Sequence, residues 1–567
     1  MNLRIWDIIP KSFRAKGVWV SLTIFVRALL NFVGLAALLP MLYLILDAES
    51  IHSNATLQSI YETFNFSSES RFAIAVAVAV VLFIVVKNLI NLLLYRVERD
   101  YIYALYRSLS RSLFVSYFGQ GLQFVKGENS AVLSRNVNVV CYTFITGVLR
   151  PLATLASEVM LLLMIFISIA IYSPLGAALA VTVFIPVALL YFTIMRYRLD
   201  LYGNVENEAQ RRKYRDVIES FRGYADIEIN NAFGHRLSLF DREIETIVNV
   251  GRKSATISML PQNLTETGLA LGMAVLLALG TSMEGADMKM LFGVFAVAGL
   301  RLLPSARNIM GAWSSLRYNR YTIEVLDKAN DVKAEQKDAT SERLLFNDKI
   351  ELRNISFRFD NGTQETLRNL SLTIAKGEKV GINGESGAGK TTLLNILLGL
   401  YAPTEGGVYI DGKELCGDVV RKWQNSIGYV SQSTFLTDST ILSNIALGCD
   451  EKDIDMAQVE QCIEASSLSE FVASLPNGIH TRIGECGALL SGGQRQRIGI
   501  ARALYKQANI LFFDEATSSL DNATEQSINS AIERLSSSNS ELTIVVVAHR
   551  DSSLGYCDRI ITLEKTN

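Results

Sequence analysis

Proline and cysteine are both scarce in this sequence. Only nine prolines occur among 567 residues, which leaves little room for proline-rich linkers. The six cysteines form no CxxC pair, and no group of cysteines and histidines has the spacing of zinc ligands. Five of the six lie in polar, charged sequence toward the end of the chain: Cys416, Cys449, Cys462, Cys486 and Cys557. A reducing compartment with free thiols is the simplest expectation.

Charged residues are scarce as well. They make up 19% of the chain, whereas soluble proteins average about 25%. Hydrophobic residues make up 49%, and the mean hydropathy is +0.24. These values argue against a disordered protein and against a purely cytosolic enzyme. The net charge of −2 produces no overall field that would attract nucleic acid, so no nucleic-acid partner is expected.

Long hydrophobic runs are concentrated in the first part of the chain. The first run, residues 18–46, carries one charge, Arg27, and is too long for the core of a signal peptide. The sequence predicts six membrane spans, at about 18–46, 72–95, 144–172, 175–195, 259–281 and 288–312. A short turn at Ser173 and Pro174 separates the third span from the fourth. We therefore expect a transmembrane domain over residues 1–320.

The charges between the spans are distributed unevenly. Basic residues precede the first span and follow the second and the fourth, for example Lys11, Arg96 and Arg196. The segment 47–71, by contrast, carries four acidic residues against a single Arg71. Because basic loops stay on the cytoplasmic side, both termini are expected in the cytoplasm, as an even number of spans requires.

Two polar segments, 96–143 and 196–258, follow the second and fourth spans. Both have helical spacing and contain no proline, so we expect helices that continue well into the cytosol. Breaks near Gly119–Gly121 and Gly223–Tyr224 are predicted to hold small transverse helices. An ordinary loop is the alternative, but structureless loops of more than about 15 residues are uncommon in compact proteins.

The remaining sequence changes character twice. Residues 321–345 are polar and poor in apolar side chains, which predicts a linker. Residues 346–567 alternate short β-rich runs with helical stretches, a pattern typical of an α/β domain with a largely parallel sheet. The predicted strands are Ile350–Phe357, Val380–Ile382, Ile427–Val430, Ile510–Phe513 and Thr543–Ala548.

A glycine-rich loop in this second part fits the pattern GxxxxGK[ST]. It follows a predicted strand and opens a predicted helix, the context that a phosphate-binding loop requires. Its glycines let backbone N–H groups approach phosphate oxygens, Lys390 would reach the β- and γ-phosphates, and the Thr391 hydroxyl would bind Mg²⁺. The candidate nucleotide-binding residues are Gly384, Glu385, Ser386, Gly387, Ala388, Gly389, Lys390, Thr391 and Thr392. A purely structural glycine-rich turn is the alternative.

Two acids end an apolar strand further along the chain. Asp514 and Glu515 follow the run Ile510–Phe513. Asp514 is placed to hold Mg²⁺, and Glu515 is placed to polarise the attacking water as a general base. An acid pair at a strand end can also cap a helix, but that interpretation is weaker alongside a phosphate-binding loop.

Further motifs identify a resemblance. The run Leu490, Ser491, Gly492, Gly493 and Gln494 resembles the signature motif of ABC ATPases. The resemblance extends to Gln432 as a catalytic and Mg²⁺-binding glutamine, Asp521 as the D-loop aspartate and His549 as the switch histidine. The segment Thr481–Gly487 is similar to an exporter motif that faces the membrane domain. Phe359 stands where the family, usually with tyrosine, stacks an aromatic ring on adenine.

Together with the six spans, these motifs make the chain resemble a half-size ABC exporter. The resemblance implies a six-helix transmembrane domain followed by an α/β P-loop ABC-type nucleotide-binding domain, with ATP and Mg²⁺ as cofactors. In this family the signature motif completes the nucleotide site of a second domain. A chain with one P-loop and one signature motif is therefore expected to work as a homodimer with two competent sites.

The transported substrate is predicted less directly. Three cations lie within predicted spans, where each costs about 2.5–3.5 kcal/mol on insertion scales: Arg27, Lys87 and Arg301. They would suit an anionic head group. The alternatives are internal ion pairs, with Glu158 or Glu266 as partners, and snorkelling of Arg27 to the membrane surface.

An amphipathic stretch in the outer loop, Leu57–Phe64, extends the resemblance to bacterial lipid-linked oligosaccharide flippases. A bacterial inner-membrane location with a lipid or amphipathic substrate is expected on this basis. Lipid-A-type flippases and multidrug exporters remain open. An ATP-gated channel or regulator is the alternative of a different class, and the presence of Glu515 favours a pump. The predicted spans exclude a soluble ABC ATPase. No protease-like domain precedes the first predicted span, which disfavours a peptide exporter that cleaves leader peptides.

Overall fold

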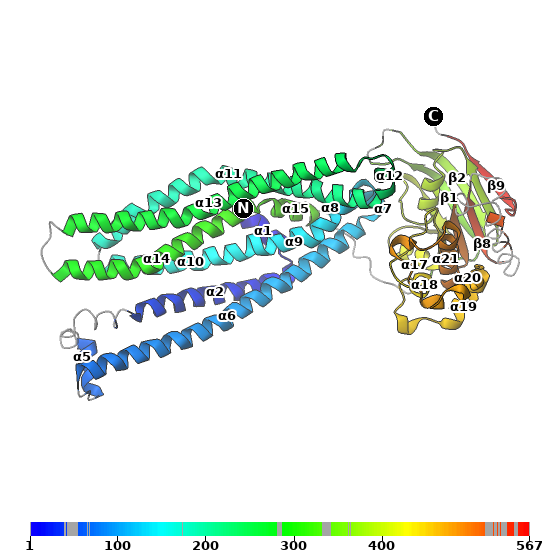
Figure 1. Ribbon diagram of the computed structural model, residues 1–567. Helices are drawn as coiled ribbons and strands as arrows, with labels where there is room; N and C mark the ends of the chain where they lie inside the picture. Colours follow the sequence, from blue (N-terminus) through cyan, green and yellow to red (C-terminus); the bar gives the residue numbers. More distant parts are fainter. Residues whose placement is uncertain are drawn as a thin grey trace. The chain divides into compact units, whose positions relative to one another are not determined.

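The computed structural model divides the chain into two compact units (Figure 1). The first comprises Met1–Gln120 and Phe124–Gln336, and the second comprises Gly121–Gln123 and Lys337–Asn567. The structure describes residues 2–38, 41, 55–64, 66, 68–172, 174–280, 286–330, 342–360, 362, 364–515, 525–526, 530, 533, 541–548 and 554–565.

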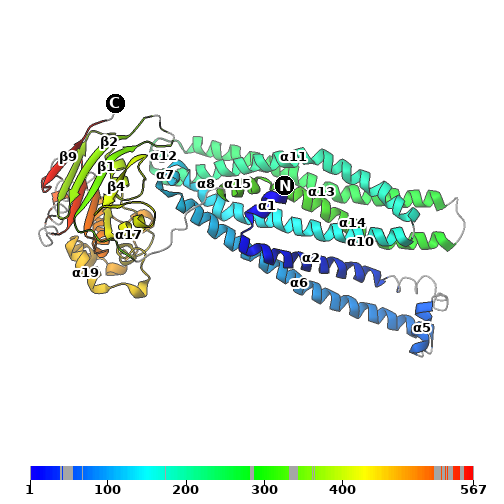
Figure 2. The same ribbon diagram turned by 180° about the vertical axis from the view of Figure 1, so that it is seen from behind.

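The first unit is helical throughout its regular described segments. Its helices include α7, whose first three residues, Gly121–Gln123, belong to the second unit. Its elements are α1 (Asn2–Ile8), α2 (Lys11–Ala36), α5 (Ala55–Thr63), α6 (Glu69–Gly119), α7 (Gly121–Gly127), α8 (Ser130–Arg135), the π-helix η1 (Asn136–Val140), α9 (Cys141–Phe144), the π-helix η2 (Ile145–Leu149), α10 (Arg150–Tyr172), α11 (Pro174–Arg222), α12 (Tyr224–Ile229), α13 (Phe233–Gly280), α14 (Ala286–Tyr318) and α15 (Tyr321–Asn330). Figures 1 and 2 both show α2 running alongside α6.

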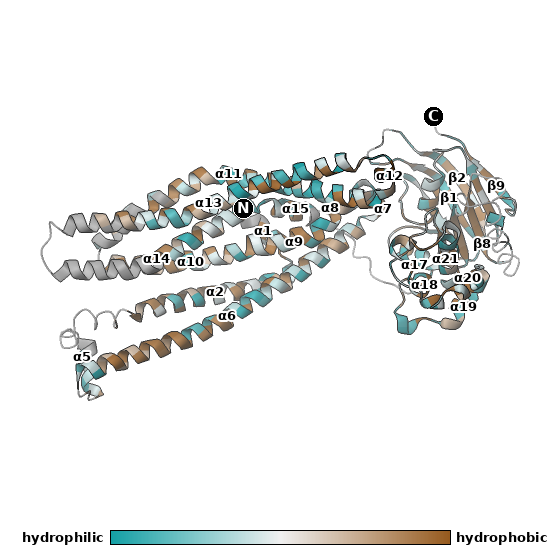
Figure 3. Cartoon of the chain, viewed as in Figure 1, coloured by the Kyte–Doolittle hydropathy of each residue, from teal (hydrophilic) through white to brown (hydrophobic). Residues whose placement is uncertain are grey.

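Helix α6 shows why these elements extend past the membrane. Its 51 residues make it about 77 Å long at 1.5 Å per residue, against about 30 Å for a hydrocarbon core. Figure 3 shows it hydrophobic toward α5 and more hydrophilic toward α7. Helices α11 and α13 are nearly as long. The predicted continuation of the spans as long helices is therefore confirmed.

Three helical segments of the described residues are long and apolar enough to cross a membrane: Lys11–Ala36, Glu69–Gly119 and Ser130–Ile171. They contain the described parts of the first three predicted spans. The end of the first span, after residue 38, lies almost entirely outside the described residues. The other three predicted spans lie on α11, α13 and α14, several of whose side chains fall outside the described set.

Large apolar side chains on α6 remain exposed within the unit. Ile74, Val78, Val81, Leu82 and Val85 are each at least half exposed. A patch of this kind marks a surface for lipid or for another protein. The two predicted breaks hold short helices, α7 and α12, as expected.

The predicted linker 321–345 is partly wrong. Its first ten residues form α15, whose Ile323 and Leu326 are buried in a core with Ile8, Leu105 and Phe144. The overall composition of the segment is polar, but Ile323 and Leu326, three positions apart, fall on one helical face, and that face is buried. The division between the units falls at Gln336.

The second unit contains two sheets. Its strands are β1 (Lys349–Phe357), β2 (Leu367–Ala375), β3 (Lys379–Gly384), β4 (Glu405–Ile410), β5 (Lys413–Glu414), β6 (Ile427–Val430), β7 (Ile510–Asp514), β8 (Thr543–Val547) and β9 (Arg559–Leu563). Its α-helices are α16 (Lys390–Leu397), α17 (Asp418–Ser426), α18 (Ile441–Ile445), α19 (Met456–Ala465), α20 (Ser469–Ser474) and α21 (Gly492–Tyr505). Short 3₁₀ turns η3 (Glu451–Asp453), η4 (Gly478–His480) and η5 (Glu485–Gly487) connect them.

Five strands form the predicted parallel sheet, in the order β6-β7-β8-β3-β9. All five residues of β7 and of β8 are buried, because both faces of a parallel sheet are covered. The other four strands form an antiparallel sheet, β2-β1-β4-β5, which Figure 2 shows from behind. The sequence predicted one largely parallel sheet, whereas the predicted strand Ile350–Phe357 belongs, as part of β1, to a second sheet that is antiparallel.

Candidate functional site

The glycine-rich loop lies between β3 and α16, as predicted. β3 ends at Gly384 and α16 begins at Lys390. Gly387 and Gly389 have φ of +86° and +92°, a region that side chains with a β-carbon rarely adopt. A β-carbon on Gly389 would also lie 2.9 Å from the carbonyl oxygen of Thr366. The chain therefore turns sharply into the N-terminus of a buried helix, a geometry suited to phosphate.

Lys390 folds back over this loop. Its Nζ donates to the carbonyl oxygens of Gly384 at 2.7 Å and Glu385 at 3.0 Å. Only 5% of the residue is exposed. Burial lowers the pKa of Lys390, and the negative charge of Glu515 opposes that shift. The charges of Lys390 and of Glu515, which directly follows β7, thus influence each other.

The acid pair stands at the end of β7, an inner strand of the parallel sheet. Asp514 is buried, and its Oδ2 accepts a hydrogen bond from the Tyr429 hydroxyl at 3.4 Å. Burial and the neighbouring Asp514 raise the pKa of Tyr429. Glu515 has φ of +49°, an uncommon value for a residue with a side chain, and its N–H donates to Val547 O at 2.8 Å. Tyr429 was missed by the sequence analysis, although it lies on β6 just before Gln432.

Gln432 and Glu515 meet at the ends of adjacent strands. Gln432 Nε2 donates to Glu515 Oε2 at 2.9 Å. The residues are 83 positions apart, and the parallel pairing of β6 with β7 brings them together. Two residues chosen from separate motifs therefore share one contact, an arrangement that can orient a water against a carboxylate base.

The signature residues begin helix α21. Ser491 is its N-cap: its hydroxyl accepts from Gln494 N at 3.3 Å, and Gln494 Oε1 accepts from Ser491 N at 2.8 Å. This reciprocal capping box leaves the helix start well formed. A β-carbon on Gly492 would meet nothing within 4 Å. Packing within the chain therefore does not require glycine there, and open space is available for a molecule to approach.

The loop and the signature motif belong to different cores of the second unit. Ala388 of the loop packs in a cluster with Leu393 and Val380. Leu490 packs in another cluster, with Leu436 and Ile441. The signature motif is thus built on a separate helical layer from the phosphate-binding loop.

Phe359 lies in an aromatic group that follows β1. Its ring stands edge-on to Phe357, with centroids 5.0 Å apart, and to Tyr401 at 5.9 Å. Phe357 and Tyr401 stack on each other at 5.3 Å. The two neighbours hold the Phe359 ring, which is 37% exposed, with a face available for stacking. Tyr401 was not anticipated from the sequence.

The side chains of three candidate residues lie outside the part of the chain that the structure describes. Asp521 and His549 lie outside the described residues. The side chain of Arg301 does so too, although its backbone belongs to α14. Their assigned roles remain predictions.

The other membrane cations lie between α2 and α6. Arg27 forms an ion pair with the buried Glu98 and lies 5.1 Å from the Tyr95 ring centroid. Glu98 was not among the partners suggested by the sequence. Lys87 lies against Gly34, where a β-carbon would be 2.7 Å from Lys87 Cδ.

The two acids suggested as partners have other contacts. Glu158 accepts from Ser305 Oγ at 2.7 Å and from Asn308 Nδ2 at 2.8 Å, linking α10 to α14. Glu266 accepts from Gln262 Nε2 at 3.1 Å on its own helix. Among the described residues, Arg27 therefore pairs with Glu98 and not with either of the two acids that the sequence suggested.

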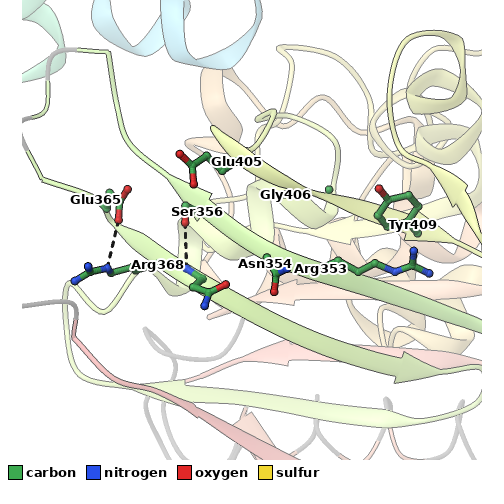
Figure 4. Close-up of a pocket in the computed structure, with 10 residues that line it drawn as sticks. Arg353, Asn354, Ser356, Glu365, Arg368, Glu405, Gly406 and Tyr409 are labelled. Atoms are coloured by element: carbon green, nitrogen blue, oxygen red, sulfur yellow. Dashed lines mark hydrogen bonds and ion pairs between the residues drawn. The ribbon is translucent and has the colours of Figure 1, made fainter.

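A polar hollow of about 590 Å³ lies on the antiparallel sheet (Figure 4). Arg353, Glu405 and Tyr409 line it, and Arg353 lies 4.3 Å from the Tyr409 ring centroid. Ser356 Oγ accepts from Asn369 N at 3.1 Å at its edge. None of the candidate site residues lines this hollow, so it is separate from the phosphate-binding loop.

Comparisons with known proteins find relatives of this chain. The ABC transporter family model matches residues 367–518. An ATP-dependent lipid A-core flippase of Ralstonia nicotianae is 31% identical over 423 residues, covering 74% of this chain and 70% of the relative. One of Cupriavidus pinatubonensis is 32% identical over 351 residues, covering 61% and 59%. The matched region thus spans about three fifths of that second relative.

Solved structures agree at the level of fold. A bacterial Atm1-family ABC exporter with ATP bound superposes with a TM-score of 0.78 and 23% identity, covering 98% of this chain and 95% of that chain. The expected combination of a helical domain and a nucleotide-binding domain is confirmed. The chain belongs to the ABC transporter family and has the organisation of a half-size ABC exporter.

Proposed function

We propose that this chain is an ATP-driven exporter that flips an anionic, lipid-anchored substrate across the bacterial inner membrane. The contact between Gln432 and Glu515 carries the ATP-driven part of the proposal, because it joins two candidate catalytic residues at the edge of the parallel sheet. Lys390 lies close enough to Glu515 for their charges to interact. A base, an orienting amide and a phosphate-binding cation are thus assembled from three motifs.

The residues present fit ATP and Mg²⁺. Asp514 is a buried carboxylate, Thr391 offers an exposed hydroxyl and Gln432 an amide oxygen. The described residues contain no cluster of three His, Cys, Asp or Glu side chains, so a metal ion would depend on nucleotide phosphates as well. Mg²⁺ prefers that arrangement, with one or two carboxylates. When bound, the ion would neutralise phosphate charge.

The chain's own residues would bind the nucleotide and take the proton of the attacking water. Loop N–H groups and Lys390 hold the phosphates, and Phe359 stacks on the adenine. Glu515 takes the proton of the attacking water at its carboxylate, while Gln432 fixes the orientation of that carboxylate.

A second copy would complete each nucleotide site. Ser491 begins a well-capped helix, and the space over Gly492 is open. A helix N-terminus with open backbone can receive the γ-phosphate of a nucleotide held by the partner copy. His549 and Asp521 are proposed to join this interface.

The relatives favour one class of substrate. Both are named lipid A-core flippases, which supports the lipid-A-type alternative over the lipid-linked oligosaccharide that we expected first. Both substrates are anionic glycolipids. Lys87, together with Arg301, is proposed to contact the anionic head group, whereas Arg27 is held by Glu98.

Replacement of the proposed base tests the catalytic assignment. Glu515→Gln should retain ATP binding and lose steady-state turnover, because the amide cannot take the proton. Lys390→Ala is the matched control: it should weaken ATP binding itself, because it removes a phosphate-contacting charge. Turnover by Glu515→Gln within a few-fold of wild type would mean that another group activates the water.

A further inference from the structure

The helical unit contains a polar cavity that the proposed transport does not use. Its volume is about 260 Å³, and it lies among α8 to α9, α11 and the break between α14 and α15. It falls outside all six predicted spans, in the part of the helices expected in the cytosol. Its size is below the range of about 300–1,000 Å³ for drug-sized ligands. A lipid is too large for it.

A buried arginine lines this cavity. Arg135 is only 4% exposed, and its Nη2 donates to Asn207 Oδ1 at 2.7 Å. It also interacts with the Tyr321 hydroxyl. Its Nε is buried and has no hydrogen-bond partner among the described residues. Leaving a buried guanidinium N–H without an acceptor is costly. Because Arg135 lines the cavity, an anion placed there would offset part of the cost of burying its positive charge.

An acid lines the same cavity. Glu206 lies one position before Asn207 on α11, and it forms no ion pair with Arg135 within 4.0 Å in the described part of the chain. Burial raises the pKa of Glu206, while Gln210 and the charge of Arg135 lower it. Glu206 and Arg135 thus line one small cavity with opposite charges that influence each other without forming an ion pair in the described part of the chain.

We propose that this cavity binds a small zwitterion from the cytosol, of the size of an amino acid or dipeptide. Its carboxylate would accept from Arg135, and its ammonium group would face Glu206. Tyr318 and Asn319, at the break between α14 and α15, also line the cavity. A bound zwitterion would therefore link α11 to the start of α15. The proposal does not depend on the transported substrate.

Calorimetry on the purified full-length chain in nanodiscs tests this. The probes are glycylglycine and the standard amino acids, with acetate and methylammonium as single-charge controls. At least one zwitterion should bind at millimolar concentration or better, and neither control should bind as tightly. Arg135→Lys, which keeps the charge but removes the planar guanidinium group, should weaken that binding by about 10- to 150-fold.

Two further variants separate binding from folding. Glu206→Gln, at a half-buried position, should weaken zwitterion binding without lowering the thermal midpoint strongly. Arg150→Gln, an exposed arginine outside the cavity, should bind as wild type does. Absence of zwitterion binding to the wild-type protein would overturn the proposal, as would Glu206→Gln and Arg135→Lys variants that bind the zwitterion as tightly as wild type.

Discussion

Arg27 and Lys87 lie on the same pair of helices in different surroundings. Arg27 is ion-paired with the buried Glu98, and removing one partner of a buried pair costs about 3–5 kcal/mol because the other charge stays unpaired. Lys87 packs its aliphatic stem against Gly34. Arg27 is therefore expected to support the fold. Lys87 is proposed to contact the substrate because its cation lies within a predicted membrane span.

Replacement separates these two roles. Arg27→Gln should lower the thermal midpoint, and Arg27→Gln with Glu98→Gln should recover much of that loss. Lys87→Gln with Arg301→Gln should instead keep the midpoint and basal ATPase while reducing transport, because a charge-assisted contact contributes about 1.5–3 kcal/mol. Thermal unfolding and transport assays measure both. Normal transport by a well-folded Lys87 and Arg301 double variant would remove the anionic-substrate assignment.

At the scale of the element, the break between α14 and α15 is tightly held. Asp200 of α11 pairs with Arg317 at 3.2 Å and with Arg320 at 3.7 Å. A β-carbon on Gly203, one turn along α11, would lie 1.9 Å from the Tyr318 carbonyl oxygen. Glycine is required there because the two backbones approach so closely.

Gly203→Ala should therefore destabilise the protein, by about 1–3 kcal/mol or more, because a backbone must move. Gly251→Ala on α13 is the control. A β-carbon there meets nothing within 4 Å, and alanine favours helix, so its effect should be neutral or stabilising. Equal thermal midpoints for the two variants would contradict the close approach.

Local motifs explain which parts were predictable. Lys390, Gln432 and Glu515 could be predicted to lie near one another because each follows a strand of a single parallel sheet, whose carboxyl ends share an edge. The pairing of Arg27 with Glu98 was not predictable in the same way. It depends on how α2 and α6 align across 71 positions, which no local pattern encodes.

Dependence on distant parts of the chain also explains why the sequence did not predict the sheet of β1 or the helix α15. The strand β1 has the apolar pattern of any buried strand, and only its partners β2 and β4 make its sheet antiparallel. The helix α15 is polar on average, and only the burial of Ile323 and Leu326 in an apolar core distinguishes it from a linker.

At the scale of the whole molecule, shared nucleotide sites predict complementation between inactive chains. A chain with Lys390→Ala and a chain with Ser491→Arg should each be inactive alone. Co-assembled, they should regain one intact site, made from the sound loop of one copy and the sound signature of the other. Nucleotide occlusion in confirmed mixed dimers is the measurement, and its absence would argue for a site within one chain.

The central claim is ATP-driven flipping of an anionic glycolipid, and a flipping assay in proteoliposomes tests it most directly. Wild-type protein should move lipid A between leaflets when ATP and Mg²⁺ are present, and Glu515→Gln at equal density should not. A neutral glycolipid of similar size should move much more slowly. Equal movement of both lipids, or flipping that Glu515→Gln supports as well as wild type, would contradict the account.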